Sequence, residues 1–284
     1  APSPSPNPGP NPNPNQAQPS LPGHRAAVSS LHWSLTGRLL LSSSADGTAC
    51  LWDVSHDKPP AAPLLRFDHA VHPPKLTGNP SGAEQRANPR FEGEVRGAQF
   101  FYLDRFCLLA SSASLHLYSY SLLKTPSHDA ARAAELRHKY QLRHKWMMAR
   151  AQAITCFAAV NSYLSPIVLV AGSDRSIAAV DLGTGQQVLE LAEVHKRPVH
   201  ALRLHEGSAH GATPAAGHDL FLSCALDSVV KLWDLRSASC ARTFEAHTNR
   251  LHPLGASLSP CLRYVAVGSE DKCAYLYDAR SGGL

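Results

Sequence analysis

The chain has 284 residues, of which 44% are hydrophobic and 17% are charged, and its formal net charge is +5. A membrane helix needs about 18 consecutive apolar residues, and the nearest approach to such a run, Ile154 to Gly172, is interrupted by polar residues and by Pro166. The sequence therefore argues against a membrane-spanning helix and predicts a globular protein with no membrane partner.

The first 22 residues contain nine prolines, which alternate with Ser, Asn and Gly. A segment of this composition cannot bury enough apolar surface to offset the entropy lost on ordering. It also lacks the basic and apolar regions of a signal peptide. We therefore predict a disordered segment over residues 1–22 and a folded domain over residues 23–284.

Three short strand patterns follow between residues 24 and 53, separated by turns that contain Gly37 and Gly47. The predicted strands are Val28 to Trp33, Arg38 to Ser43 and Thr48 to Asp53. Strands that follow one another through such short turns indicate an antiparallel meander.

Four side chains hold fixed positions in this unit, namely His24, Ser42, Asp46 and Trp52. An imidazole, a hydroxyl, a carboxylate and an indole N–H offer matching donors and acceptors, so they can be buried together without an unpaired polar atom. Their spacing resembles that of a WD repeat, the propeller-blade unit of about 40 to 45 residues. The resemblance implies a hydrogen-bonded chain that runs from the tryptophan through the serine and the histidine to the aspartate and stiffens one blade.

A second copy keeps all four positions, with His195, Ser223, Asp227 and Trp233. Its histidine and aspartate are 32 residues apart instead of 22, which indicates an insertion of ten residues. We predict a structural tetrad in each of these two units.

A third copy lies at the end of the chain and is degenerate. It has His247 and Asp271, but Tyr277 replaces the tryptophan and Val267 replaces the serine. The sequence therefore predicts that its hydrogen-bond network is incomplete.

Two further units rest on strand pattern more than on motif. Around Asp174, Val170 and Val180 occupy the serine and tryptophan positions, so we expect apolar packing alone. The run from Val95 to Tyr120 has three strand patterns and Tyr118 at the tryptophan position, and it carries no tetrad.

Together the five units predict an all-β protein, a WD-repeat β-propeller with insertions near residues 70–90, 124–139 and 206–218. The resemblance implies that a closed ring has about seven blades, the last of which takes an outer strand from the start of the chain. Residues 1–22 are unsuited to form that strand, so we expect an open or incomplete ring and a fragment of a larger one.

The insertion after residue 123 is basic. Residues 124–150 hold seven Lys or Arg against two acidic residues, a surplus equal to the net charge of the whole chain. A helix is predicted from His128 to His138 with Ser127 as its N-cap, and an outer strand from Tyr140 to Met148. The charge could attract nucleic acid, but Lys and Arg that alternate with apolar residues are typical of a solvated edge strand, so nucleic acid is the less favoured partner.

The tetrads contain the residue types of a hydrolase triad, but they occur twice at repeat spacing and without an oxyanion loop. We therefore predict no catalytic residues and no cofactor. The 16 histidines include no group with zinc-ligand spacing, so no metal is expected. Seven cysteines without a Cys-x-x-Cys pair indicate reduced thiols in the core and an intracellular protein, cytoplasmic or nuclear.

The resemblance implies two candidate partner sites. One is the top face of the ring, where the loops after the repeat histidines and beside the repeat aspartates emerge. Its candidate residues are Arg25, Arg175, Lys196, Arg197, Asn249, Arg250, Glu270 and Lys272. Most are basic, which suits an acidic peptide or a phosphorylated protein, although turn residues are often polar without any binding role.

The other candidate site is a pair of motifs that close two successive repeats. Trp233-Asp234-Leu235-Arg236 and Tyr277-Asp278-Ala279-Arg280 resemble the paired WDxR signature of substrate receptors for cullin-4 ubiquitin ligases. The resemblance implies that Asp234, Arg236, Asp278 and Arg280 face the ligase adaptor.

The sequence as a whole predicts a non-enzymatic scaffold that binds other proteins. A cullin-4 substrate receptor is the first alternative, and a basic propeller associated with nucleic acid is the second.

Overall fold

The computed structural model describes residues 21–56, 60–68, 91, 93–122, 139–163, 165–205 and 219–283. Every element among them is a β-strand, and the 19 strands form five sheets. Four predicted features lie outside the described residues: most of the disordered segment, the loop 70–90, the helix 128–138 and the insertion near 206–218. The described part of the chain contains no helix of a length and hydropathy that could cross a membrane.

The strands of each sheet lie side by side in chain order. The first sheet contains β1 (Val28–Trp33), β2 (Leu39–Ser44), β3 (Ala49–Asp53) and β4 (Leu65–Phe67). The second contains β5 (Val95–Phe101), β6 (Phe106–Ser111), β7 (Ser114–Ser121) and β8 (Lys139–Met147). The third contains β9 (Ile154–Ala159), β10 (Ile167–Gly172), β11 (Ile177–Asp181) and β12 (Gln186–Leu191). The fourth contains β13 (Val199–Leu204), β14 (Leu220–Ala225), β15 (Val229–Asp234) and β16 (Ser239–Phe244). The fifth contains β17 (Ala256–Leu258), β18 (Tyr264–Gly268) and β19 (Ala274–Asp278).

The five predicted units correspond to these five sheets, which confirms the predicted fold class. Strand β1 has the predicted bounds, and β2 and β3 each begin one residue later than predicted. The turns that separate them contain Gly37 and Gly47 with φ of 68° and 76°, a left-handed conformation that glycine adopts without a steric cost.

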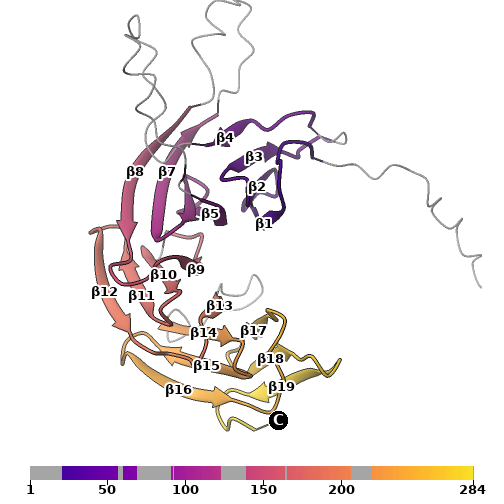
Figure 1. Ribbon diagram of the computed structural model, residues 1–284, viewed down its shortest axis with the longest axis vertical. Helices are drawn as coiled ribbons and strands as arrows, with labels where there is room; N and C mark the ends of the chain where they lie inside the picture. The colour runs from indigo at the N-terminus through magenta and orange to yellow at the C-terminus, as the bar shows by residue number, and fades with distance from the viewer. Residues whose placement is uncertain are drawn as a thin grey trace, which may run out of the picture.

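The sheets follow one another around an arc, with the first and the fifth sheet at its two ends (Figure 1). The inner strand of each sheet is its first strand, because β1 contacts β5, β5 contacts β9, β9 contacts β13 and β13 contacts β17. Residues of β1, β5, β9 and β13, the first strands of four successive sheets, border a cavity of about 360 Å³. This is the arrangement of consecutive blades in a β-propeller.

The antiparallel strands place their connections alternately at two edges of the arc. The upper rim holds the loop before the first strand of each sheet and the turn between its second and third strands. The lower rim holds the turn between the first and second strands and the connection between the third and fourth. The two predicted partner sites therefore lie on opposite rims.

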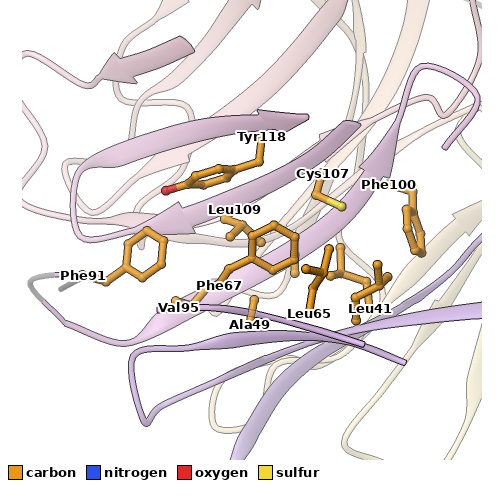
Figure 2. Close-up of a cluster of buried hydrophobic side chains, with 12 residues drawn as sticks. Leu41, Ala49, Leu65, Phe67, Phe91, Val95, Phe100, Cys107, Leu109 and Tyr118 are labelled. Carbon is orange, nitrogen blue, oxygen red and sulfur yellow. The ribbon is translucent and has the colours of Figure 1, made fainter. Parts of the chain in front are cut away.

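The apolar core is divided into clusters that lie between neighbouring sheets. In the cluster of Figure 2, Leu41 and Phe67 of the first sheet meet Phe100 and Tyr118 of the second, and all four side chains are fully buried. Each such burial contributes about 1.5–3 kcal/mol. Similar clusters join the second sheet to the third, the third to the fourth and the fourth to the fifth.

Asp104, in the turn between β5 and β6, connects three sheets through hydrogen bonds. Its carboxylate accepts the N–H of Leu35 in the first sheet's lower turn at 2.9 Å and the side-chain amide of Asn161, which follows β9, at 2.6 Å. The N–H of Asp104 donates to Asn161 Oδ1 at 3.1 Å. These bonds hold the lower turns of the first three sheets together.

Apolar side chains stay exposed at both ends of the arc. On β1, Leu31 is 62% and Trp33 is 56% exposed, and Trp33 lies opposite Leu40 on the face directed away from the second sheet. On β19, Leu276 is 56% exposed, whereas its neighbour Tyr277 packs toward the fourth sheet. Within the described residues, these two outward faces are the sheet faces that no neighbouring sheet covers.

The interpretation of the cysteines as core residues is partly wrong. Cys50, Cys107 and Cys224 are buried, but Cys240, Cys261 and Cys273 are exposed. Cys240 lies on β16, the outer strand of the fourth sheet, and Cys261 and Cys273 lie in turns of the fifth sheet. All seven are free thiols.

Gly172, at the end of β10, tests the close packing of the third sheet. A Cβ there would lie 2.7 Å from Met148 Cε and 2.8 Å from Ala151 Cβ. We expect Gly172→Ala to lower the free energy of unfolding by about 1–3 kcal/mol, because no single displacement relieves both contacts. In the control Gly255→Ala the new Cβ meets nothing within 4 Å, and the change should be about 0.5 kcal/mol or less. Urea unfolding measures both variants, and an equal loss of unfolding free energy in the two would contradict the close packing at Gly172.

Candidate functional site

The first tetrad forms a continuous hydrogen-bonded chain. Trp52 Nε1 donates to Ser42 Oγ at 2.9 Å, Ser42 Oγ lies 2.7 Å from His24 Nε2, and His24 Nδ1 lies 3.2 Å from Asp46 Oδ2. Because a carboxylate only accepts, the imidazole donates through Nδ1–H, and in that tautomer its Nε2 accepts the serine hydroxyl. Every donor in the chain thus has an acceptor.

The second tetrad repeats this geometry in the fourth sheet. Trp233 Nε1 donates to Ser223 Oγ at 2.9 Å, Ser223 Oγ lies 2.7 Å from His195 Nε2, and His195 Nδ1 lies 3.1 Å from Asp227 Oδ2. The structure therefore brings together all eight side chains that the sequence groups into tetrads.

Each tetrad aspartate also fixes the upper rim. Asp46 Oδ2 accepts the N–H of Arg25 at 2.8 Å, and its Oδ1 accepts the hydroxyl of Thr48 at 2.6 Å. Burial alone would raise the pKa of Asp46, but the hydrogen bonds from Thr48, Arg25 and His24 together lower it to about 2. The carboxylate thus joins the loop before β1 to the turn before β3.

The tetrad serines are poorly placed for catalysis. Ser42 is 2% and Ser223 is 0% exposed, and each hydroxyl accepts an indole N–H from inside its own sheet. A substrate carbonyl has no path to either oxygen without opening the sheet. The arrangement is suited to bracing a blade.

The fifth sheet replaces the tetrad with a shorter contact. His247 Nδ1 lies 3.0 Å from the hydroxyl of Tyr277, without a serine between them. Asp271 accepts the hydroxyl of Tyr275 at 2.6 Å and remains exposed. The sequence predicts an incomplete network here, but it does not show that the longer reach of the tyrosine hydroxyl restores one of its bonds.

Sequence reasoning also missed a buried histidine in the second sheet. His116 on β7 is 2% exposed and packs edge-on against Phe91 with ring centroids 5.3 Å apart. Burial, reinforced by the positive charge of Lys145, lowers the pKa of His116 to about 4. It therefore acts as a neutral core residue near pH 7, in a sheet without a tetrad.

The predicted top-face residues divide into two groups on the upper rim. Five of them carry a positive charge and are exposed, namely Arg25, Lys196, Arg197, Arg250 and Lys272. The partly buried Arg175 is paired with Glu193 at 2.9 Å.

The other two predicted top-face residues have structural roles. Asn249 is 1% exposed, and its backbone bonds reciprocally with Ser228 in the fourth sheet's upper turn. Glu270 Oε1 accepts the N–H groups of residues 250, 251 and 252 at 3.0, 2.6 and 2.9 Å, and these bonds lower the pKa of its carboxyl. Sequence position alone could not separate them from the exposed cations.

The WDxR residues lie on the lower rim. Asp234 Oδ1 accepts the N–H of Arg236 at 2.9 Å, and Asp278 Oδ1 accepts the N–H of Arg280 at 2.8 Å, so both aspartates stabilise turns. The guanidinium of Arg242 donates twice to the carbonyl of Arg280, at 2.9 and 2.8 Å. The side chains of Arg236 and Arg280 are exposed, and Arg236 lies 4.0 Å from Asp219.

Three segments of the chain match the family model described as WD domain, G-beta repeat, over residues 15–53, 191–234 and 238–278. These segments contain both tetrads and the degenerate third copy. The second and third sheets, which the sequence supports by strand pattern more than by motif, lie almost entirely outside the matches.

The chain is also similar to curated proteins. It is 23% identical over 274 residues to the guanine nucleotide-binding protein subunit beta of Saccharomyces cerevisiae, covering 92% of this chain and 51% of that protein. It is 27% identical over 126 residues to the E3 ubiquitin-protein ligase COP1 of Arabidopsis thaliana, covering 44% of this chain and 17% of that protein. It is 35% identical over 80 residues to WD repeat-containing protein 55 of Arabidopsis thaliana, covering 28% and 20%. The chain thus spans about half or less of the length of these relatives.

Removing one tetrad hydroxyl should be costly. In Ser223→Ala, both the indole N–H of Trp233 and Nε2 of His195 lose their buried partner. We expect the free energy of unfolding to fall by about 2–4 kcal/mol, measured by urea unfolding. Ser237→Ala is the control, since its exposed hydroxyl bonds only to Ser239, and it should change stability by about 0.5 kcal/mol or less. A similar small change in both variants would show that the tetrad does not brace the sheet.

The tetrad also predicts an acid-dependent loss of stability. The pKa of Asp46 is about 2 in the folded protein and about 3.9 in an unfolded chain. A depressed pKa contributes stability that is complete above about pH 4 and is lost as the pH falls through about 2. Unfolding measured between those pH values should therefore depend less on pH in Asp46→Asn than in the wild type. An identical pH dependence would rule out this contribution.

Proposed function

We propose that this chain, which carries WD40 repeats, is a non-enzymatic scaffold that binds other proteins inside the cell, in the cytoplasm or the nucleus. The observation that carries the proposal is that its polar residues fall into two groups, one buried and one exposed. The tetrad side chains, which have the residue types of a hydrolase triad, are buried and stabilise their sheets. Exposed charged side chains lie on the rims, whose loops the tetrads hold in place. Such a molecule offers rigid binding surfaces, and its tetrad serines are too deeply buried to act as nucleophiles.

The upper rim supports an acidic partner. Its exposed cations are Arg25, Lys196, Arg197, Arg250 and Lys272. The backbone N–H groups of Arg25 and Lys196 bond to the tetrad aspartates at 2.8 and 3.0 Å, so their loops are fixed before a partner arrives. A preorganised loop loses less entropy on binding than a free one.

The lower rim supports the alternative of a cullin-4 substrate receptor. Arg236 and Arg280 are exposed on the connections that follow β15 and β19. The two hydrogen bonds that the Arg242 guanidinium donates to the carbonyl of Arg280 fix the backbone there. An exposed guanidinium on a backbone fixed in this way suits bidentate pairing with a carboxylate of the adaptor. One similar protein carries the name E3 ubiquitin-protein ligase COP1, which describes that protein.

A narrower resemblance concerns the third sheet. The run from Ile154 to Val170, with Ala158-Ala159-Val160-Asn161, is similar to the C-terminal propeller of WD repeat-containing protein 27. This resemblance also favours a scaffold, and it adds no chemistry.

Affinity purification of the full chain from cell lysate, followed by mass spectrometry, tests both functions. The scaffold predicts a defined set of partner proteins. The receptor predicts a cullin-4 adaptor that is lost in Arg236→Ala/Arg280→Ala, because truncated interface arginines often cost about 2 kcal/mol or more each. The matched control, Arg25→Ala/Arg197→Ala, removes two exposed arginines from the other rim.

The outcomes separate the two functions. An adaptor lost only in the lower-rim variant supports the receptor, and an adaptor kept in both variants contradicts that use of the motifs. Recovery of chaperones alone would contradict the scaffold.

A further inference from the structure

A groove that no sequence motif marks lies on the lower rim, between the second and third sheets. It has a volume of about 560 Å³. Phe106, Leu117 and Leu182 give it apolar walls, and Arg105, Arg143 and His144 lie at its polar side. Its size is within the range of about 300–1,000 Å³ that is typical of ligand sites.

The groove is positively charged. Arg105 and Arg143 are exposed, and no Asp or Glu lines the groove among the described residues. Within that part of the chain, neither guanidinium forms an ion pair, and Arg143 Nε donates to Ser119 Oγ at 2.8 Å. Because the hydroxyl of Ser119 is uncharged, this hydrogen bond orients the guanidinium without compensating its charge.

The turn beside the groove is strained and exposes apolar side chains. Tyr102, Leu103 and Asp104 all have left-handed φ, of 53°, 56° and 61°. Such a conformation is unfavourable for residues with a Cβ and persists only where the surroundings impose it. Here Asp104 imposes it, through its bonds to the N–H of Leu35 and to the side chain of Asn161.

The strained turn brings an aromatic ring to the groove. Tyr102 is 38% exposed and Leu103 is 45% exposed. The ring centroid of Tyr102 lies 6.3 Å from that of Phe106, which forms an apolar wall of the groove. Tyr and Arg are the residue types that dominate binding energy at protein interfaces, and here both stand beside one cavity.

We propose that this groove binds a short segment of a partner protein in which an apolar side chain is flanked by carboxylates. The apolar side chain packs against Phe106, Leu117 and Leu182, and the carboxylates pair with Arg105 and Arg143. The apolar walls favour a peptide over a nucleic acid, whose backbone offers charge without an aliphatic side chain. The proposal rests on the scaffold function and places one partner contact on the lower rim.

Fluorescence anisotropy with the full chain tests it. The probe is a labelled 12-residue peptide of Glu and Asp with a central Leu-Phe pair. Three comparison ligands are the same peptide with Ser-Ser at the centre, the same peptide with Lys in place of the acids, and an oligouridine of equal length. We expect the first peptide to bind at least about tenfold more tightly than any of the three. The Ser-Ser peptide and the oligouridine lack the apolar side chains, whose burial is equivalent to about that factor or more, and the Lys peptide lacks the two exposed ion pairs, which together are equivalent to about that factor.

Two charge-reversal variants locate the site. Arg105→Glu/Arg143→Glu should weaken binding of the acidic Leu-Phe peptide by about tenfold or more. Arg38→Glu/Arg150→Glu makes the same charge change at two exposed arginines outside the groove and outside the proposed upper-rim site, and it should leave binding of that peptide unchanged. Hydrogen exchange should show protection by the peptide at residues 105–106 and 182–185. All four arginines are exposed, and a thermal melt that matches the wild type confirms that each variant is folded.

Three results would overturn the proposal. These are equal weakening in both variants, equal binding of the Ser-Ser peptide, and binding of oligouridine as tight as that of the peptide. The scaffold function is judged separately, because partner proteins recovered by purification would support it even where the groove binds no peptide.

Discussion

Apolar burial between sheets is the interaction on which the rest of this structure depends. Leu41 and Phe67 reach full burial only because Phe100 and Tyr118 of the next sheet cover them. A lone sheet of three or four short strands cannot build a stable core for itself. Each sheet must therefore be rigid enough to present a fixed face to its neighbours, and the polar residues that matter most are those that supply this rigidity.

The sheets obtain that rigidity in two ways. The first and fourth sheets use complete hydrogen-bonded chains from Trp52 and Trp233 to a turn carboxylate. The third sheet has Val180, which is fully buried, at the tryptophan position. In the first solution the buried indole N–H has its acceptor, and in the second the apolar side chain needs none, whereas a half-complete polar network would be costly. The fifth sheet uses an intermediate solution, because the hydroxyl of Tyr277 bonds directly to His247 without a serine between them.

Local patterns allowed the strands and both tetrads to be predicted, because turn glycines such as Gly37 and fixed offsets such as those between Ser42 and Trp52 lie within one sheet. Features that depend on contacts between sheets could not be predicted. Nothing in the sequence around Asn249 shows that it is buried against Ser228. The groove was missed for the same reason, since Arg105 and Leu182 are brought together only when the second and third sheets pack.

The uncovered faces at the two ends of the arc are chemically unlike. One presents Leu31 and the indole of Trp33, and the other presents Leu276 among small residues of β18 and β19. An interface between the two would be heterologous, with the front of one sheet meeting the back of another, as between neighbouring sheets inside the arc. A further copy of the chain added at either end therefore continues the rotation from one sheet to the next, toward a ring or a helical array. A two-fold pair would instead need each face to be complementary to itself.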